Sequence, residues 1–292
     1  MTRSARTLLA ACLLAVSGEN SAAGVPPSPS SAEPLAPAGS AEGPAPSAPP
    51  APTPSTAENG AWRTEAQAGI EYESLSDGHG PWRGVVVEVS RHGSRHRALH
   101  LTARDTTRFS LRDRAVGAAA THPLGGRVTA SGELEVSPSH RVLPAWALGA
   151  RAGVRLPRGY AAHAGLRHRR YDGVTVNLLD GGAERYVGRY RLAYTAYLAR
   201  LSGGETAASH AARLDRFYGR DESNLLGVGL AAGAELEHLG SGTILRTPVR
   251  ALSLLGRHWF TPRWALVYGA GMHDQGALYT RRGGSVAVRY RF

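Results

Sequence analysis

The sequence contains no lysine, so all 34 basic residues are arginines, and with 23 acidic residues they give a formal net charge of +11. The arginines are spread along the chain, which argues against the focused basic patch of a nucleic-acid-binding protein. The one cysteine, Cys12, lies near the N-terminus. The remainder of the chain therefore has no disulfide framework or cysteine-ligated zinc site. Beyond the N-terminus there is no run of eighteen apolar residues, which excludes a transmembrane helix there.

The first 23 residues have the pattern of a secretory signal peptide. Arg3 and Arg6 form a basic region, Thr7–Val16 is apolar, and small residues up to Ala23 offer a cleavage site. Such a segment is too short to span a membrane and is removed after export. The residues that end at Cys12 also resemble a lipobox, the acylation site of bacterial lipoproteins. Lipidation of Cys12 is therefore an alternative.

Residues 24–60 form a Pro/Ala/Ser-rich linker. Eleven of the eighteen prolines of the chain lie in it, and aromatic and branched apolar residues are almost absent. Such a segment cannot bury enough apolar surface to offset the entropy lost on ordering. We expect a disordered, extended tether in the periplasm. A ligand for a proline-binding partner is the less favoured interpretation.

From residue 61 onward, short segments alternate apolar and polar residues, as in β-strands, whose successive side chains point to opposite faces. Clusters of glycine, proline, serine and aspartate separate these segments at intervals that suit membrane-spanning strands of about 9–11 residues. The pattern predicts fourteen strands, which begin near Glu65, Trp82, Arg97, Arg108, Gly126, Ala145, Tyr160, Val174, Arg185, Thr206, Leu225, Ile244, Trp264 and Gly284. Loss of the weak hairpin near Arg97 and Arg108 would give twelve strands.

The predicted fold of residues 61–292 is all-β: an up-and-down antiparallel transmembrane β-barrel. Export, terminal aromatic residues and aromatic residues near strand ends distinguish it from a soluble periplasmic β-protein, which is the alternative. Tyr290 and Phe292 end an amphipathic strand and resemble the C-terminal signal that the barrel-assembly machinery reads. Eight further aromatic residues are expected to form two interfacial girdles: Trp62, Trp82, Trp146, Tyr160, Tyr171, Trp259, Trp264 and Tyr279.

Several motifs resemble the YaiO family of outer-membrane β-barrels. They are Ser137–Pro144, Glu184–Gly188, Gly256–Trp259, Gln275–Arg281 and Arg289–Phe292, in the order of the family. The resemblance covers the whole expected barrel and implies an outer-membrane location, but it carries no catalytic residues. Some members have helical repeats before the barrel. This chain has the Pro-rich linker there instead, so a partner function of such repeats is not transferred.

Five arginines lie on the polar faces of the expected strands and are candidate lumen-lining residues: Arg185, Arg189, Arg191, Arg289 and Arg291. Inside a barrel they would attract anionic solutes or acidic polysaccharide. The favoured alternative is that they form ion pairs with strand carboxylates and help to fill the barrel. The carboxylates considered for this role are Glu133, Glu135, Glu235 and Glu237.

Other residues invite a chemical interpretation. His92, His96 and His100 are spaced by four, which would suit a metal site on a helix, but the surrounding pattern is that of a turn and a strand. His273–Gln275 and Ser139–His140 fall in expected loops, where a rim-active hydrolase could place a base and a nucleophile. Ordinary polar loop residues are the favoured interpretation. The sequence predicts no metal, no cofactor and no catalytic residue.

The sequence therefore predicts a monomeric barrel in the outer membrane of a Gram-negative cell, with its N-terminal segment in the periplasm. Two functions stay open: a structural or transport barrel linked to envelope polysaccharide, and a rim-active enzyme. Expected partners are outer-membrane lipid and the barrel-assembly machinery, with anionic polysaccharide as a candidate and no nucleic acid.

A deletion tests the linker assignment. Removal of Gly24–Thr56, with the signal peptide kept, should leave the barrel folded, because this segment has no core-forming residues. Heat-modifiable mobility on a semi-native gel is the measurement. Loss of the heat-modifiable form would show that the linker packs against the barrel.

Overall fold

A computed structural model of the chain describes residues 62–76, 78–93, 96–219, 222–238 and 244–292. The expected signal peptide, Cys12 and the whole of the expected linker lie outside these residues. Within the described ranges, no helix has the length and apolarity needed to cross a membrane.

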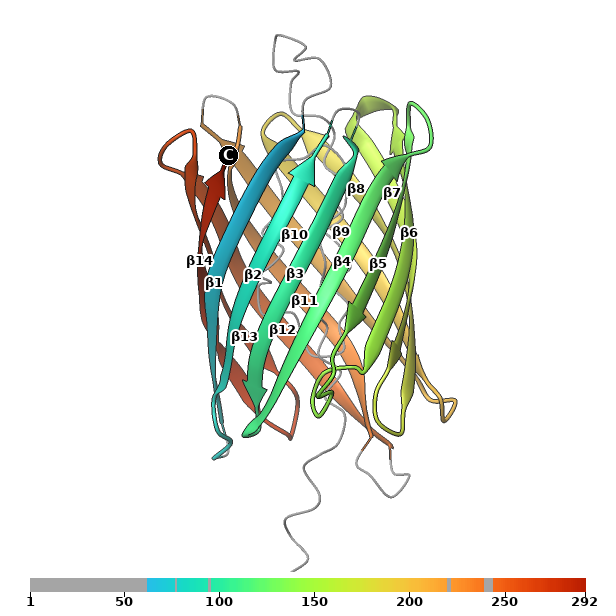
Figure 1. Cartoon of the computed structure of the whole chain (residues 1–292). Helices are drawn as coiled ribbons and strands as arrows, with labels where there is room; N and C mark the ends of the chain where they lie inside the picture. The colour runs from blue at the N-terminus through green and yellow to red at the C-terminus, as the bar shows by residue number, and fades with distance from the viewer. Residues whose placement is uncertain (1–61, 77, 94–95, 220–221, 239–243) are drawn as a thin grey trace, which may run out of the picture.

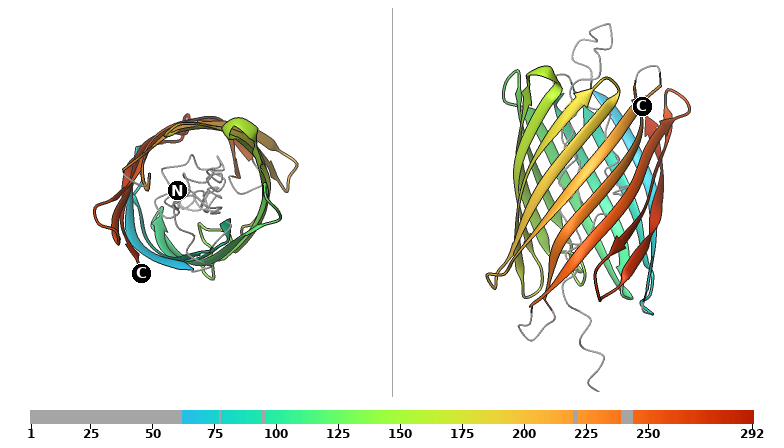
Figure 2. Two further views of the ribbon diagram at one scale, coloured as in Figure 1. Left: turned by 90° about the horizontal axis from the view of Figure 1, so that it is seen from above. Right: turned by 180° about the vertical axis from the view of Figure 1, so that it is seen from behind.

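Fourteen antiparallel strands, each paired with its neighbours in sequence, close into a barrel, so the predicted fold class is confirmed. The strands cross the barrel at a tilt, and they form a ring in the view along its axis (Figures 1 and 2). They are β1 (Arg63–Leu75), β2 (Trp82–His92), β3 (Ala98–Arg108), β4 (Leu111–Pro123), β5 (Val128–Val136), β6 (Trp146–Leu156), β7 (Tyr160–Arg170), β8 (Thr175–Val187), β9 (Tyr190–Leu201), β10 (Thr206–Tyr218), β11 (Asn224–His238), β12 (Ile244–Trp259), β13 (Trp264–Asp274) and β14 (Thr280–Arg291).

The first and last strands close the sheet. β1 pairs with β14 over the register from Glu65 opposite Arg291 to Leu75 opposite Arg281. Beyond the ladder, the backbone N–H of Phe292 donates to the carbonyl of Thr64 at 3.0 Å. Closure leaves no edge strand, which satisfies the backbone hydrogen-bonding groups that lipid cannot satisfy.

The barrel has two distinct ends. We call the end where β1 begins and β14 ends the terminal end, and the opposite end the far end (Figure 1). At the far end, the loop between β5 and β6 folds against β4. There the buried carboxylate of Asp113 accepts hydrogen bonds from the backbone N–H groups of Val142 and Leu143, at 2.6 and 2.9 Å. The Ser137–Pro144 motif is therefore a loop anchored at the far end.

The outward faces of the strands are largely apolar, and the inward faces hold the buried charged and polar residues together with some apolar ones. On β2, Val85, Val87 and Val89 are exposed, and the alternate positions Glu88 and Ser90 are buried. This inverted pattern is that of a membrane barrel, whose outer face contacts lipid. The strand starts follow the predicted positions within a few residues. The twelve-strand alternative is wrong, because β3 and β4 pair along their whole length.

The prediction of two aromatic girdles needs correction. Trp62, Trp146, Tyr160 and Trp264 are exposed, but Trp82, Tyr171 and Tyr279 are buried and Trp259 lies on the inner face. A strand-end position does not by itself decide which face a residue occupies. The outer aromatic belt gathers at the terminal end, where it includes Trp62, Tyr160, Tyr190, Trp264 and Phe292.

The C-terminal residues offer a test of the face assignment. Phe292→Asp should strongly lower the yield of folded barrel in outer-membrane fractions, whereas Arg291→Gln should retain most of it, because Phe292 is exposed and Arg291 faces inward. A charge near the membrane interface costs only about 0–1 kcal/mol. We therefore attribute the expected loss to recognition of the C-terminus during assembly. Equal yields of Phe292→Asp and wild type would contradict both the face assignment and the signal.

Candidate functional site

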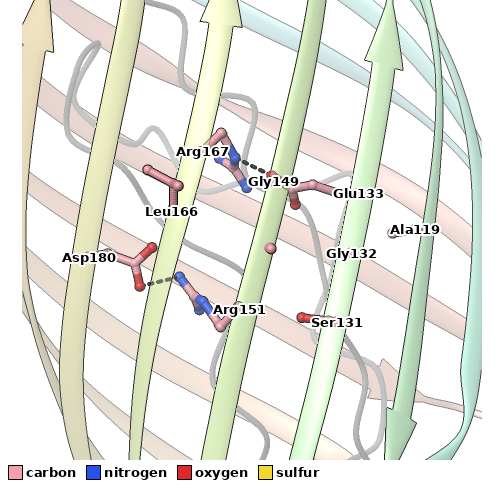
Figure 3. Close-up of a pocket in the computed structure, with 10 residues that line it drawn as sticks. Ala119, Ser131, Gly132, Glu133, Gly149, Arg151, Leu166, Arg167 and Asp180 are labelled. Atoms are coloured by element: carbon pink, nitrogen blue, oxygen red, sulfur yellow. Dashed lines mark hydrogen bonds and ion pairs between the residues drawn. The ribbon is translucent and has the colours of Figure 1, made fainter.

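The inner wall carries most of the buried charged side chains, and two of their ion pairs reach across a glycine of the strand between them. In Figure 3, Glu133 on β5 and Arg167 on β7 are paired across Gly149 of the intervening strand β6. The three residues occupy one register row, with Glu133 opposite Gly149 and Gly149 opposite Arg167. A side chain at Gly149 would overlap the Glu133 carboxylate.

The next row repeats this arrangement one strand further along. Arg151 on β6 donates to Asp180 on β8 at 2.8 Å, and Gly165 of β7 lies between them in the register (Figure 3). A Cβ at Gly165 would lie 2.6 Å from the Asp180 carboxylate. The ring of His163 approaches the same carboxylate at 3.6 Å. The two ion pairs, Glu133–Arg167 and Arg151–Asp180, line one pocket.

The network continues across β8, β9 and β10. Arg191 donates through Nε to Asp215 at 2.7 Å, and Glu184 lies 3.9 Å from the same guanidinium. Arg213 donates to the second carboxylate oxygen of Asp215 at 2.8 Å. Gly227 on β11 lies opposite Asp215, whose carboxylate leaves no room for a Cβ there. Asp215 therefore binds two arginines at once.

A second cluster joins β14 to β1 and β2 near the terminal end. Glu65 lies within 3.5 Å of three guanidinium groups, those of Arg63, Arg289 and Arg291. Arg289 also donates to the side-chain carbonyl of Gln67 at 2.7 Å. Because β1 and β14 are the ends of the barrel domain, these contacts reinforce the closure of the sheet.

Pairing of these groups is a physical requirement. A charge removed from water costs several kcal/mol unless a partner of opposite sign and hydrogen bonds compensate for it. Neighbouring inward residues lie in adjacent strands, about 4.8 Å apart. A glycine in the middle strand has no side chain, so long side chains from the two flanking strands can reach over it and pair, lying flat against the wall.

An aromatic cluster marks the inner face of the far end. Trp82 is buried with Arg108 and Arg281 over its ring, at 4.7 and 4.6 Å from the centroid. Arg281 also pairs with Glu73 at 3.4 Å. The ring of Tyr279 packs edge-on against Trp82. These contacts explain why aromatic residues expected in an outer girdle lie inside.

The structure divides the five candidate arginines. Arg191, Arg289 and Arg291 lie on the inner face. Arg185 lies on the outer face, where it stacks on Tyr160 with 4.1 Å between the guanidinium carbon and the ring centroid. Arg189 lies in a turn at the terminal end and pairs with Glu222 at 3.1 Å.

The error for Arg185 and Arg189 comes from a turn inside the supposed strand. Gly188 and Arg189 form a two-residue hairpin between β8 and β9, in which Gly188 has φ 56. Glycine at the first central position is typical of such a turn. Val187 and Tyr190 then pair and share the outer face, so the inward and outward positions shift by one across the turn.

The expected carboxylate partners were also mostly different. The inner arginines of the predicted set contact Glu65, Glu184 and Asp215, none of which was proposed as a partner. Glu133 pairs with Arg167 instead, Glu135 is buried, and Glu235 accepts a hydrogen bond from Gln275. The side chain of Glu237 lies outside the described part of the structure. Counting alternate positions from each turn would have found Asp180 and Asp215 as inward residues.

The three histidines spaced by four in the sequence, His92, His96 and His100, do not form one cluster. His92 and His100 have ring centroids 5.4 Å apart on the inner face. His96 lies in the β2–β3 turn, where burial and the adjacent Arg155 guanidinium lower its pKa, and Arg155 donates to it at 2.9 Å. Among the described residues, no group of three or more histidine, cysteine, aspartate or glutamate side chains is placed to hold a metal.

The residues considered for a hydrolase do not form a catalytic arrangement. His273 ends up inside the barrel, fully buried near the end of β13, and not in a loop. The Ser139 hydroxyl accepts a hydrogen bond from the backbone of Arg114. The His140 ring contacts the backbone carbonyls of Ser137 and Pro138. No nucleophile and base contact each other at these positions.

With this architecture established, the chain can be compared with known proteins. Residues 63–237, more than half of the chain, match the family described as the YaiO membrane beta barrel domain. The chain belongs to the YaiO family. The resemblance inferred from its motifs is thereby confirmed, and both the family and the fold place it in the outer membrane. No curated protein matches the sequence.

Solved structures similar to this YaiO-family barrel include several outer-membrane proteins. The "CymD monoaromatic hydrocarbon channel" has a TM-score of 0.53 at 10% identity, over 79% of this chain and 88% of that chain. A "Bacterial polysaccharide outer membrane secretin" has 0.49 at 9% identity, over 79% and 98%. The "Anion-selective porin from Comamonas acidovorans" has 0.46 at 8% identity, over 80% and 100%. At such low identity these similarities concern the fold alone.

Adding one methyl group at a glycine on the inner or the outer face of the wall tests the role of the glycine rows, the register rows in which a glycine separates two paired charges. Gly149→Ala should lower the free energy of unfolding by about 1–3 kcal/mol, because its Cβ would displace the Glu133 carboxylate from Arg167. Gly132→Ala is the matched control, since it faces outward and its Cβ would have no neighbour closer than 3.8 Å. Urea unfolding in lipid vesicles measures both. Equal stability of the two variants would contradict the account.

Proposed function

We propose that this YaiO-family protein is a transport barrel that carries polar solutes through the outer membrane. The observation that carries the proposal is the inner wall, whose charged side chains form ion pairs inside a closed sheet. A wall of this kind offers hydrogen bonds along its length without a strong preference for one sign of charge.

The size of the barrel supports a transport role. About eight strands give an interior that side chains just fill, and 16–18 strands leave an aqueous channel. The fourteen strands here lie near the upper part of this range. The glycine rows keep the ion-paired side chains flat against the wall, which saves space towards the barrel axis.

The proposal includes an orientation. Residues 1–23 act as the signal peptide of a Gram-negative cell, and the barrel-assembly machinery inserts the chain with its terminal end towards the periplasm. Short turns typically face the periplasm in such barrels, and the longest connection between consecutive strands, residues 137–145, lies at the far end. The loop that contains Leu143 then lies at the cell surface.

We propose envelope saccharides as the solute class. Sugars present many hydroxyl groups, which paired carboxylates and guanidinium groups can bind as acceptors and donors. An acidic polysaccharide is the candidate macromolecular partner.

Single-channel recording in a planar bilayer tests this function. The folded barrel should produce discrete conductance steps with weak ion selectivity, because its inner charges are paired. Glu133→Gln should shift selectivity towards anions, since it removes the carboxylate that faces Arg167. The outward Gly132→Ala variant should leave selectivity unchanged. Absence of conductance from heat-modifiable, correctly folded protein would contradict the transport proposal.

A further inference from the structure

Near the terminal end, one arginine of the inner wall is held by a backbone carbonyl and not by a carboxylate. Arg257 on β12 is fully buried, and no carboxylate lies within ion-pair distance of it among the described residues. Its Nε and Nη2 both donate to the carbonyl of Ser223, at 3.0 and 2.8 Å. Within the described ranges, its Nη1 has no hydrogen-bond acceptor. The guanidinium is therefore held in a fixed orientation with its buried Nη1 amino group left over.

A second buried donor lies two residues along the same inner face. The indole Nε1–H of Trp259 has no hydrogen-bond acceptor in the described structure. Arg291 covers the ring of Trp259, with 3.9 Å between the guanidinium carbon and the centroid. Buried donors without a partner are rare in proteins because each costs about 1–3 kcal/mol. Two of them, together with adjacent positive charge, indicate a place for an acceptor.

The register explains how these side chains come together. Trp259 lies opposite Ala265, and Ala265 lies opposite Arg289, so one small residue separates them. Ala265 and Val267 are fully buried on the inner face of β13, where Ala265 lies between Trp259 and Arg289, and Val267 lies between Arg257 and Ala287. The row from Trp259 through Ala265 to Arg289 thus resembles the glycine-bridged pairs, except that hydrogen-bond donors lie on both sides of the small residue.

The local charge is positive. Glu65 is in contact with Arg63, Arg289 and Arg291, and Glu88 approaches Arg289 at 3.9 Å. Arg257 lies within electrostatic range of this cluster and is repelled by Arg289 and Arg291. By comparison, Asp215 pairs with two arginines, Arg191 and Arg213, whereas Glu65 pairs with three. The terminal end therefore has a surplus of guanidinium groups.

We propose that Arg257 and Trp259, with Arg289 and Arg291 beside them, form a binding site for an oxyanion, a carboxylate or phosphate group of a solute, at the terminal end of the barrel. A guanidinium with fixed orientation binds such groups through short, charge-assisted hydrogen bonds. The site deepens the proposed function, because it assigns an acidic group to the transported saccharide. It also gives a role to the segments Gly256–Trp259 and Arg289–Phe292.

Calorimetric titration of the full-length barrel in detergent tests the site. Sodium glucuronate and inorganic phosphate are the two anionic probes, and glucose is the neutral control. Wild type should bind at least one anion and not glucose, and the stronger of the two identifies the preferred group. Arg257→Gln should weaken binding by tenfold or more. Trp259→Phe keeps a ring for Arg291 but removes the N–H donor, and it should weaken binding about threefold to tenfold.

Arg216→Gln is the matched control, because Arg216 lies on the outer face near the same end and should not affect binding. Heat-modifiable mobility establishes that each variant is folded. Should Arg257→Gln fail to fold, Trp259→Phe decides the question alone. Anion binding that is equal in wild type and Trp259→Phe, or absent from folded wild type, would overturn the site. Conductance without anion binding would refute this site only, and anion binding without conductance would refute the transport proposal only.

Discussion

Charges inside a closed barrel must neutralise one another, because the sheet separates them from lipid and their neighbours exclude much of the water. The strands here meet this requirement with ion pairs that reach across an intervening strand, from Glu133 to Arg167 and from Arg151 to Asp180. A glycine at the middle of each row provides the passage. The wall is thus polar and close to neutral along β5 to β10, and stiff because each charged group is tied to another strand.

The same principle connects closure of the barrel with the chemistry of its terminal end. Glu65 gathers arginines from β1 and β14, so the last pairing of the sheet is also an electrostatic contact. Arg257 and Trp259 carry donors that the described residues do not use. An incompletely paired cluster is where a solute can make contacts that the protein does not supply itself.

Much of the fold could be predicted from the sequence, because alternation and turn residues report directly on strands. The fourteen strand starts and the C-terminal strand from Val286 to Phe292 needed no tertiary information. The site was harder, since the turn at Gly188 shifts the alternation by one residue, so that Arg191 lies inside as expected but Arg185 lies outside. Partners such as Glu65 and Arg289 are separated by most of the chain, and only the register of the closed sheet brings them together.

The central claim, that paired charges across glycine rows stabilise the wall, is tested most directly by exchanging the two partners of one pair. Glu133→Arg and Arg167→Glu should each lower the free energy of unfolding by about 3–5 kcal/mol, because each places like charges together in a buried position. The double variant restores opposite charges around Gly149 and should recover most of this loss. Urea unfolding in lipid vesicles gives the three values. If the double variant lost as much unfolding free energy as the two single variants together, the charges would not act as a pair, which would contradict this explanation.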